Sequence, residues 1–141
     1  MAGEEKKEPG LKLSFQLTVT DLATTEAFYG GILELAIKRS LTVRGAPEHL
    51  VLTGKEWELI FVDEKAVIRE HPILEERFAM FPKGIGMTLH FQVENIEEIY
   101  DAMIEEELEI LYPLEEKPYG MKDFWCFDPD GYLVVIEEST R

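Results

Sequence analysis

Three side chains in the apolar segments of this chain could take part in acid–base or metal chemistry. Glu58 lies in the segment WELIF, His90 in MTLHFQV, and Glu137 near the end of YLVVIEE. Carboxylate and imidazole groups are ligands for divalent cations. A carboxylate whose pKa is raised by burial can also exchange protons with an imidazole. The three residues therefore predict a metal site if they converge, or an acid–base pair of Glu58 and His90.

Further polar side chains alternate with apolar ones in two segments, LSFQLTV (13–19) and MTLHFQV (87–93). A period of two predicts half-buried β-strands, so the polar residues of each strand should share one face. We expect these faces to point toward polar surroundings; if they enclosed a cavity, it would suit an organic molecule with hydrogen-bonding groups and a flat apolar part. The predicted ligand-binding residues are Ser14, Gln16, Glu58, Thr88, His90, Gln92, Trp125 and Glu137.

The elements that would position these residues follow the same order in both halves of the chain. After the first strand, Thr20 or Asp21 can cap a helix that ends at Gly30-Gly31, and three strand candidates follow at 36–45, 48–54 and 56–64. After the second, residues 94–110 predict an amphipathic helix, again followed by three strand candidates. Its apolar positions are Ile96, Ile99, Tyr100, Met103 and Ile104. Each half is therefore predicted to be a βαβββ module, which makes the chain an internal duplication.

We predict an α+β fold of two tandem βαβββ modules. Residues 1–10 are expected to be a disordered leader and residues 11–141 a single domain. Within it, the first module spans about 11–64, a connector about 65–85, and the second module about 86–138. The connector is expected to hold a short helix around Leu74 to Met80.

Composition limits the partners and the compartment. The 29 acidic and 14 basic residues give a formal net charge of −15, which repels phosphate backbones and anionic lipids. We therefore expect no nucleic-acid partner and no membrane partner. One cysteine excludes an intrachain disulfide, and the charged N-terminus lacks the apolar stretch of a signal peptide. We expect a cytoplasmic protein.

The stretch Asp128-Pro129-Asp130-Gly131 separates the last two strand candidates. Proline presets φ, aspartate accepts backbone hydrogen bonds, and glycine tolerates a positive φ, so this stretch predicts a tight turn. We expect both aspartates to shape the turn rather than to act in catalysis.

The first strand is followed by VTDLATTEAFYGGILEL, the last turn and strand read DPDGYLVVIE, and the βαβββ plan is duplicated. In these features the chain resembles the vicinal oxygen chelate superfamily over residues 11–138. That superfamily includes glyoxalase, extradiol dioxygenases and bleomycin-binding proteins. The resemblance implies that the two paired modules form a cup-shaped sheet, and that the cup is the active site. It also implies a homodimer, which the open sheet edges of this architecture favour.

Catalytic members of the superfamily hold a divalent cation with four side chains. The resemblance places these positions at Ser14, Glu58, Thr88 and Val135, of which only Glu58 is a strong ligand. His90 and Glu137 each lie two residues, roughly 6.6 Å, beyond a ligand position, too far without a register shift. We therefore expect no cofactor; if a metal were present, Glu58, His90 and Glu137 would hold it.

Three functions remain open. The first is a metal-independent protein that binds a small molecule, a drug or a metabolite, as bleomycin-binding members do. The second is a metal-dependent lyase, isomerase or dioxygenase with an atypical ligand set. The third is an interaction protein whose cup is vestigial, in which the polar faces would pack together and leave no cavity.

Overall fold

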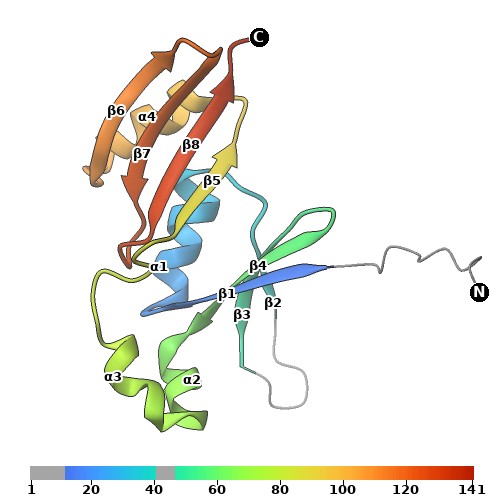
Figure 1. Ribbon diagram of the computed structural model, residues 1–141, viewed down its shortest axis with the longest axis vertical. Helices are drawn as coiled ribbons and strands as arrows, with labels where there is room; N and C mark the ends of the chain where they lie inside the picture. Colours follow the sequence, from blue (N-terminus) through green and yellow to red (C-terminus); the bar gives the residue numbers. More distant parts are fainter. Residues whose placement is uncertain (1–11, 41–46) are drawn as a thin grey trace, which may run out of the picture.

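The computed structural model describes residues 12–40 and 47–141 and contains two four-stranded sheets (Figure 1). The predicted leader, residues 1–10, lies outside the described residues. The first module contains strands β1 (Leu13–Val19), β2 (Lys38–Ser40), β3 (His49–Thr53) and β4 (Trp57–Asp63), with helix α1 (Leu22–Glu26) after β1. Its sheet has the order β1-β4-β3-β2, and β1 runs parallel to β4.

The second module repeats this arrangement. It contains β5 (Thr88–Gln92), helix α4 (Ile96–Glu105), β6 (Ile110–Lys117), β7 (Met121–Phe127) and β8 (Leu133–Ser139). Its sheet has the order β5-β8-β7-β6, and β5 runs parallel to β8. The predicted α+β fold of two βαβββ modules is confirmed. In each described sheet the first strand of the module, β1 or β5, lies at an edge.

Two local predictions were wrong, and a third was confirmed but incomplete. The first helix does not end at its glycines, because α1 continues as a π-helical segment, η1 (Ala27–Ile32), through both of them. The short helix expected around Leu74 to Met80 is present as α3 (Glu75–Phe78). It is preceded by two segments that were not expected, α2 (Glu64–Glu70) and the 3₁₀ turn η2 (Pro72–Leu74). On α4 the apolar face is narrower than predicted, because Ile104 is 53% exposed while Ile96, Ile99 and Met103 are buried.

One continuous core joins the helices to the sheets. Tyr29 lies at its centre, with its ring 4.7 Å from that of Phe61 in the first sheet and 6.0 Å from that of Phe91 in the second. The second half of the core packs α4 against β7 and β8, where Tyr100 contacts Phe124 edge to face. Cys126, buried on β7, is a free thiol.

The Asp128–Gly131 turn between β7 and β8 also links the two modules. One carboxylate oxygen of Asp128 accepts the N–H groups of Asp130 and Tyr132, each at 2.9 Å, as predicted for a turn-shaping aspartate. Its other oxygen accepts the hydroxyl of Tyr29, in the first module, at 2.6 Å. The turn residue thus satisfies donors from both halves of the chain.

Two further bonds from this turn reach the end of β1. Asp130 accepts the backbone N–H of Thr20 at 3.1 Å, and the Tyr132 hydroxyl donates to the carbonyl of Thr18 at 2.8 Å. Gly131, at φ +88°, lies so close to Pro82 that a Cβ there would come within 2.5 Å of the proline ring. The turn therefore fixes how the first sheet sits against the second.

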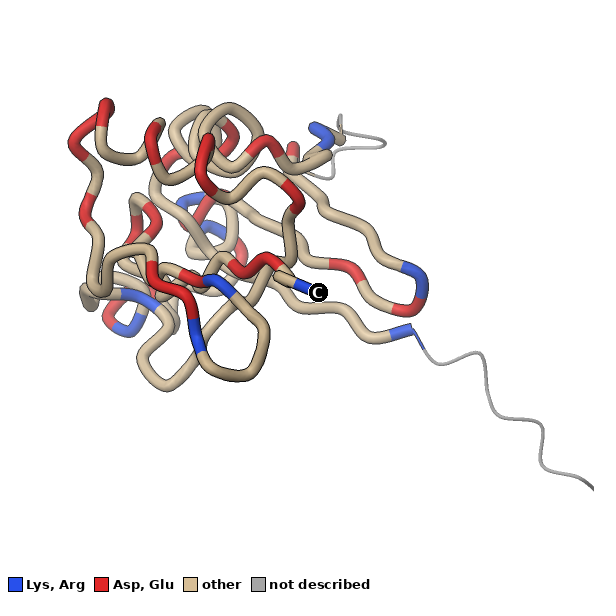
Figure 2. Tube along the Cα trace, turned by 90° about the horizontal axis from the view of Figure 1, so that it is seen from above, with Lys and Arg blue, Asp and Glu red and all other residues tan. Residues whose placement is uncertain are grey.

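The negative charge is concentrated in the second module. Residues 86–141 carry fifteen acidic and three basic residues, whereas residues 64–85 carry four of each. Acidic positions accordingly outnumber basic ones along the trace (Figure 2). No helix among the described residues is long and apolar enough to cross a membrane.

The buried turn makes stability depend on pH. Burial raises the pKa of Asp128 to about 6 from 3.8, against the opposing effect of the Tyr29 hydrogen bond. The folded protein therefore binds this proton more tightly than the unfolded chain, and the contribution of Asp128 to the free energy of unfolding decreases as pH rises from about 4 to 6. Relative to Asp128→Asn, the wild type should lose on the order of 3 kcal/mol over this range.

Urea denaturation of both proteins at several pH values measures this difference. Asp101→Asn, which removes an exposed carboxylate of α4, is the matched control and should keep the wild-type profile. Parallel profiles for the wild type and Asp128→Asn would contradict the assignment.

Candidate binding cleft between the two modules

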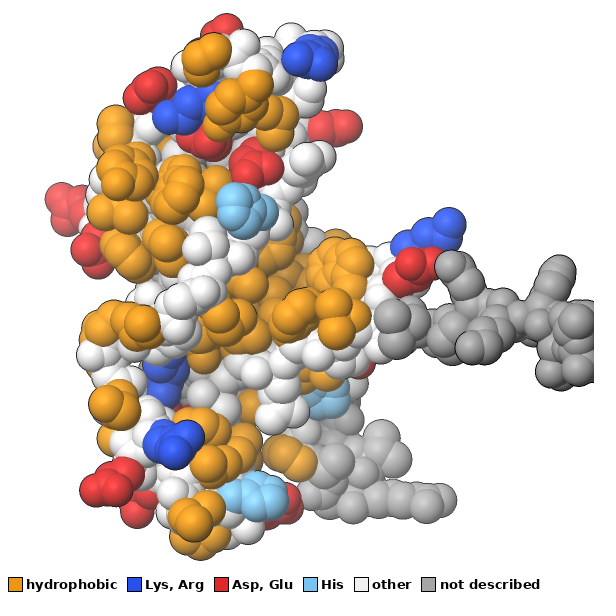
Figure 3. Space-filling view, viewed as in Figure 1, with side chains coloured by type: hydrophobic (Ala, Val, Ile, Leu, Met, Phe, Trp, Pro, Cys, Tyr) orange, Lys and Arg blue, Asp and Glu red, His pale blue; other side chains and the backbone are white. Residues whose placement is uncertain are grey.

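An apolar cleft of about 420 Å³ lies between the sheets. Figure 3 shows apolar side chains gathered across the middle of this face of the molecule. The first module contributes residues from β1, β3, β4 and the link between η1 and β2, and the second contributes four consecutive residues of β5. The lining residues are Phe15, Leu35, Ala36, Leu52, Thr53, Trp57, Leu59, Leu89, His90, Phe91 and Gln92.

The cleft exists because the apolar strand faces extend beyond the core. Leu17 and Val19 of β1 are buried, but Phe15 on the same face is 43% exposed and Trp57 on the adjacent strand is 40% exposed. On β5, Leu89 and Phe91 pack against the core with one side and line the cleft with the other. Alternation along β5 predicts that Leu89 and Phe91 face the core, but alternation alone does not distinguish a filled face from an open one.

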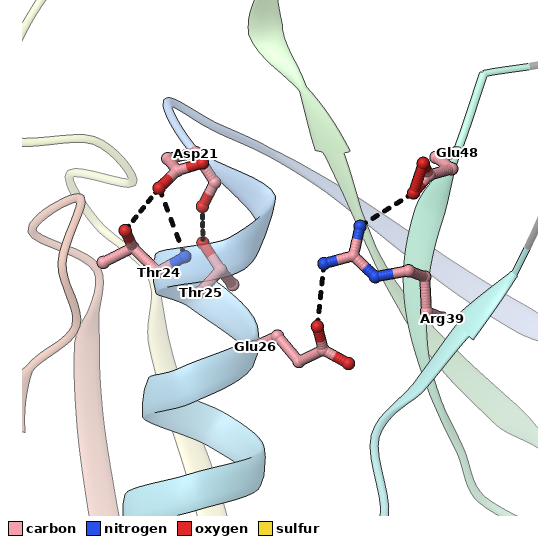
Figure 4. Close-up of polar contacts among 6 residues, drawn as sticks. All are labelled: Asp21, Thr24, Thr25, Glu26, Arg39 and Glu48. Atoms are coloured by element: carbon pink, nitrogen blue, oxygen red, sulfur yellow. Dashed lines mark hydrogen bonds and ion pairs between the residues drawn. The ribbon is translucent and has the colours of Figure 1, made fainter.

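The wall formed by Leu35 and Ala36 is held in place by a charged clamp (Figure 4). Arg39, three residues further on in β2, donates to Glu26 of α1 at 2.7 Å and to Glu48 at 2.8 Å. At the start of the same helix Asp21 accepts the Thr24 N–H, which confirms the predicted cap. These contacts tie the link between η1 and β2 to its neighbours on both sides.

A histidine–carboxylate pair lies at the rim of the cleft. His90 is half-exposed, and its Nδ1 lies 2.5 Å from a carboxylate oxygen of Glu137. The two residues come from the parallel strands β5 and β8, where Glu137 is opposite Gln92, the next cleft residue on the polar face. The carboxylate fixes the orientation of the ring, so its other nitrogen is free to face a bound molecule.

Glu58 makes a separate pair on the first sheet. Its carboxylate accepts the Ser14 hydroxyl at 2.8 Å and lies 3.3 Å from the Lys12 ammonium. The hydrogen bond from Ser14, followed by that from Lys12, lowers the pKa of Glu58. The expectation that burial would raise this pKa is therefore wrong, and an ionised carboxylate of low basicity is a weak general base.

The donor set does not fit a divalent metal. Of the four positions implied by the resemblance, Val135 has no donor atom and is buried, while the Ser14 hydroxyl is engaged by Glu58. In the part of the chain that the structure describes, no three His, Cys, Asp or Glu side chains form a group that could hold a metal ion. His90 and Glu137 meet, but Glu58 does not join them in such a group.

The structure separates the other predicted binding residues. His90 and Gln92 line the cleft, whereas Ser14, Gln16 and Thr88 are exposed outside it. Trp125 packs edge to face against Tyr112 on the second sheet, 5.4 Å between ring centroids, and does not line the cleft. Beside it, burial raises the pKa of Asp123. The described residues thus form an apolar cleft with a polar rim. Two separate carboxylate pairs, Glu58 with Ser14 and Glu137 with His90, lie on the adjoining strands.

Comparison with known proteins supports the resemblance. The family model described as Glyoxalase/Bleomycin resistance protein/Dioxygenase superfamily matches residues 13–136. No protein with a curated description matches the chain.

Solved structures share the fold at low identity. A glyoxalase-related enzyme from Fulvimarina pelagi superposes with a TM-score of 0.62 at 17% identity, covering 90% of this chain and 86% of its own. The lactoylglutathione lyase from Agrobacterium tumefaciens gives 0.57 at 18% identity, with 95% and 97% covered. The hypothetical protein SA1046 from S. aureus gives 0.65 at 14% identity, with 96% and 95% covered.

The donor chemistry predicts weak metal binding. Protein purified without a histidine tag or chelator should contain far less than one zinc, nickel, iron or manganese ion per chain. The reason is that the Glu58 carboxylate and the His90–Glu137 pair do not come together in one ligand group. Elemental analysis by plasma mass spectrometry measures this content. Stoichiometric metal that is lost in Glu58→Ala and retained in Glu56→Ala, an exposed neighbour outside the ligand positions, would contradict the prediction.

Proposed function

The chain belongs to the glyoxalase/bleomycin resistance protein/dioxygenase superfamily, and on that premise we propose that it binds a small organic molecule, a drug or a metabolite, without a metal ion. The bound molecule occupies the cleft between the modules. The observation that carries this proposal is the apolar cleft itself, whose volume of about 420 Å³ lies within the ordinary range for small-molecule sites.

The lining indicates the chemistry of the bound molecule. Phe15, Trp57 and Phe91 offer aromatic surfaces that favour a flat, apolar body. His90 and Gln92 supply hydrogen-bonding groups along one side of the rim, and Thr53 supplies a hydroxyl. A neutral or cationic aromatic molecule with one polar end matches this arrangement.

Charge near the cleft disfavours an anionic molecule. Glu137 pairs with the rim residue His90, and the lowered pKa of Glu58 keeps that carboxylate ionised on the adjoining sheet. The excess of acidic residues over the whole chain acts in the same direction. It also supports the proposal that neither nucleic acid nor membrane is bound. The single cysteine supports the proposal that the protein is cytoplasmic.

The two other functions have less support. A metal-dependent lyase, isomerase or dioxygenase needs a set of donors with open positions for substrate, and the described residues offer no group of three. A vestigial cup in a pure interaction protein would leave no cavity, whereas the inter-module cleft is open. Capture of a small molecule uses the features that the chain does have.

Fluorescent probes test the proposal. N-phenyl-1-naphthylamine is neutral, and 1-anilinonaphthalene-8-sulfonate has the same ring system with one negative charge. We expect saturable one-to-one binding of the neutral probe, and weaker binding of the sulfonate because Glu58 and Glu137 repel it. Fluorescence titration, with heat-unfolded protein as a blank, gives both dissociation constants.

Two tryptophan substitutions, at Ala36 and Ala79, locate the site. Ala36→Trp places an indole in the cleft and should weaken binding of the neutral probe by at least about tenfold, or ~1.4 kcal/mol. Ala79→Trp, at an exposed position on the connector, is the control and should bind as the wild type does. Equal affinity in all three proteins would place the probe elsewhere and refute the proposal.

A further inference from the structure

A hydrogen bond at the rim of the cleft decides which nitrogen of His90 carries a hydrogen. The Nδ1 atom lies 2.5 Å from a carboxylate oxygen of Glu137. An ionised carboxylate only accepts hydrogen bonds, so the hydrogen between the two atoms belongs to Nδ1. In a neutral imidazole one nitrogen is a donor and the other an acceptor. The Nε2 atom of His90 is therefore a hydrogen-bond acceptor whenever the ring is neutral.

This acceptor is the ring nitrogen that remains for a molecule in the cleft. Strand β5 is the edge strand of its sheet and has β8 on one side only. The ring turns Nδ1 toward β8, where Glu137 lies. His90 also lines the cleft, to which the second module contributes only residues 89–92 of β5. Nε2 is not engaged by Glu137, so it can face a group bound beside β5.

The histidine–carboxylate pair is not needed to hold β5 against β8. The two strands are already paired along five residues, from Thr88 to Gln92 on β5. The side chains of the pair are 52% exposed for His90 and 19% exposed for Glu137. An ion pair at the surface contributes at most about 1 kcal/mol to stability. Glu137 therefore matters more for the orientation and tautomer of the ring than for the fold.

The rest of the polar rim also favours a donor over an anion. The described residues that line the cleft include no lysine and no arginine, so an anionic group would meet no permanent positive charge there. Gln92 lies two residues beyond His90 on the same face of β5, opposite Glu137. Its amide can present the carbonyl oxygen to the group that His90 contacts. The polar side of the cleft is therefore an acceptor side, and the other walls are mainly apolar.

We propose that the molecule bound in the cleft is an aromatic compound whose polar end is an uncharged hydrogen-bond donor, a hydroxyl or N–H group, which binds Nε2 of His90. This inference rests on the proposed function and narrows it: His90 sets the specificity, and Glu137 is a positioning residue that holds the acceptor tautomer. An ether or a ketone presents only lone pairs to Nε2 and is disfavoured. Because the rim is half-exposed, water can replace the lost partner. The preference is therefore that of one ordinary hydrogen bond, about fivefold in affinity.

The tautomer can be measured without any bound molecule. Long-range ¹H–¹⁵N correlation spectra, recorded about two units above the ordinary imidazole pKa, show which ring nitrogens carry hydrogen, and His90→Phe identifies the signals of His90. The wild type should have hydrogen on Nδ1 and none on Nε2. Glu137→Gln should lose this preference, because an amide can either donate or accept. Glu116→Gln, which removes an exposed carboxylate from β6 of the same sheet, is the matched control and should keep the wild-type tautomer.

Two matched competitors test the specificity. 2-Naphthalenemethanol and its methyl ether have the same ring system, but only the alcohol donates a hydrogen bond. Each is titrated against bound N-phenyl-1-naphthylamine in the wild type and in His90→Phe, which keeps a ring and removes the acceptor. The ether-to-alcohol ratio of dissociation constants should be about fivefold larger in the wild type. The difference in hydrophobicity between the competitors cancels in this comparison.

Each part of the proposal can fail separately. Hydrogen on Nε2 in the wild type would overturn it, and so would equal ether-to-alcohol ratios in the wild type and His90→Phe. An unchanged tautomer and ratio in Glu137→Gln would refute the positioning role of Glu137. These failures leave the proposed function standing, provided that Ala36→Trp weakens binding of N-phenyl-1-naphthylamine. A probe that does not bind in the cleft would instead overturn the proposed function and this inference with it.

Discussion

The Asp128–Gly131 turn is the constraint on which the arrangement of the two modules depends. Asp128 accepts the Tyr29 hydroxyl, and Asp130 accepts the Thr20 N–H. Both donors belong to the first module, while the turn joins the last two strands of the second. Buried hydrogen bonds to a carboxylate are costly to leave unmade, so the modules are held in one relative position. The separation of β1 from β5, and with it the cleft, follows from that position.

The cleft is the part of the apolar strand faces that the chain itself does not cover. Tyr29 and its aromatic neighbours fill the space between the sheets at one end of the strands. Toward the other end Phe15 and Trp57 are left half-exposed, and no side chain of residues 12–40 or 47–141 fills the gap between them and β5. Transfer of an aromatic molecule from water into such a gap is favourable. The same strands thus stabilise the fold and create its binding surface.

Much of the fold could be predicted from the sequence, because period-two and helical patterns report which face of an element meets a core. The duplication of the βαβββ plan, the Asp21 cap and the turn at Asp128 were all predicted in this way. The π-helical extension through Gly30 and Gly31 and the helix α2 could not be, since tertiary packing overrides local preference there. For the site, the alternation placed His90 and Gln92 on one face of β5 and Leu89 and Phe91 on the other, whereas all four line the cleft. It could not show that the apolar set lines an open cleft, nor that Ser14 and Lys12 lower the pKa of Glu58, because these facts depend on how distant segments meet.

The central claim is that the apolar cleft, rather than the polar strand faces, holds the bound molecule. The most direct measurement is a set of nuclear Overhauser contacts between N-phenyl-1-naphthylamine and methyl groups of selectively labelled protein. We predict contacts to the methyl groups of Leu52, Leu59 and Leu89, which line the cleft. Contacts confined to the methyl groups of Val135 and Leu111 on the second sheet, with none to these three leucines, would contradict it.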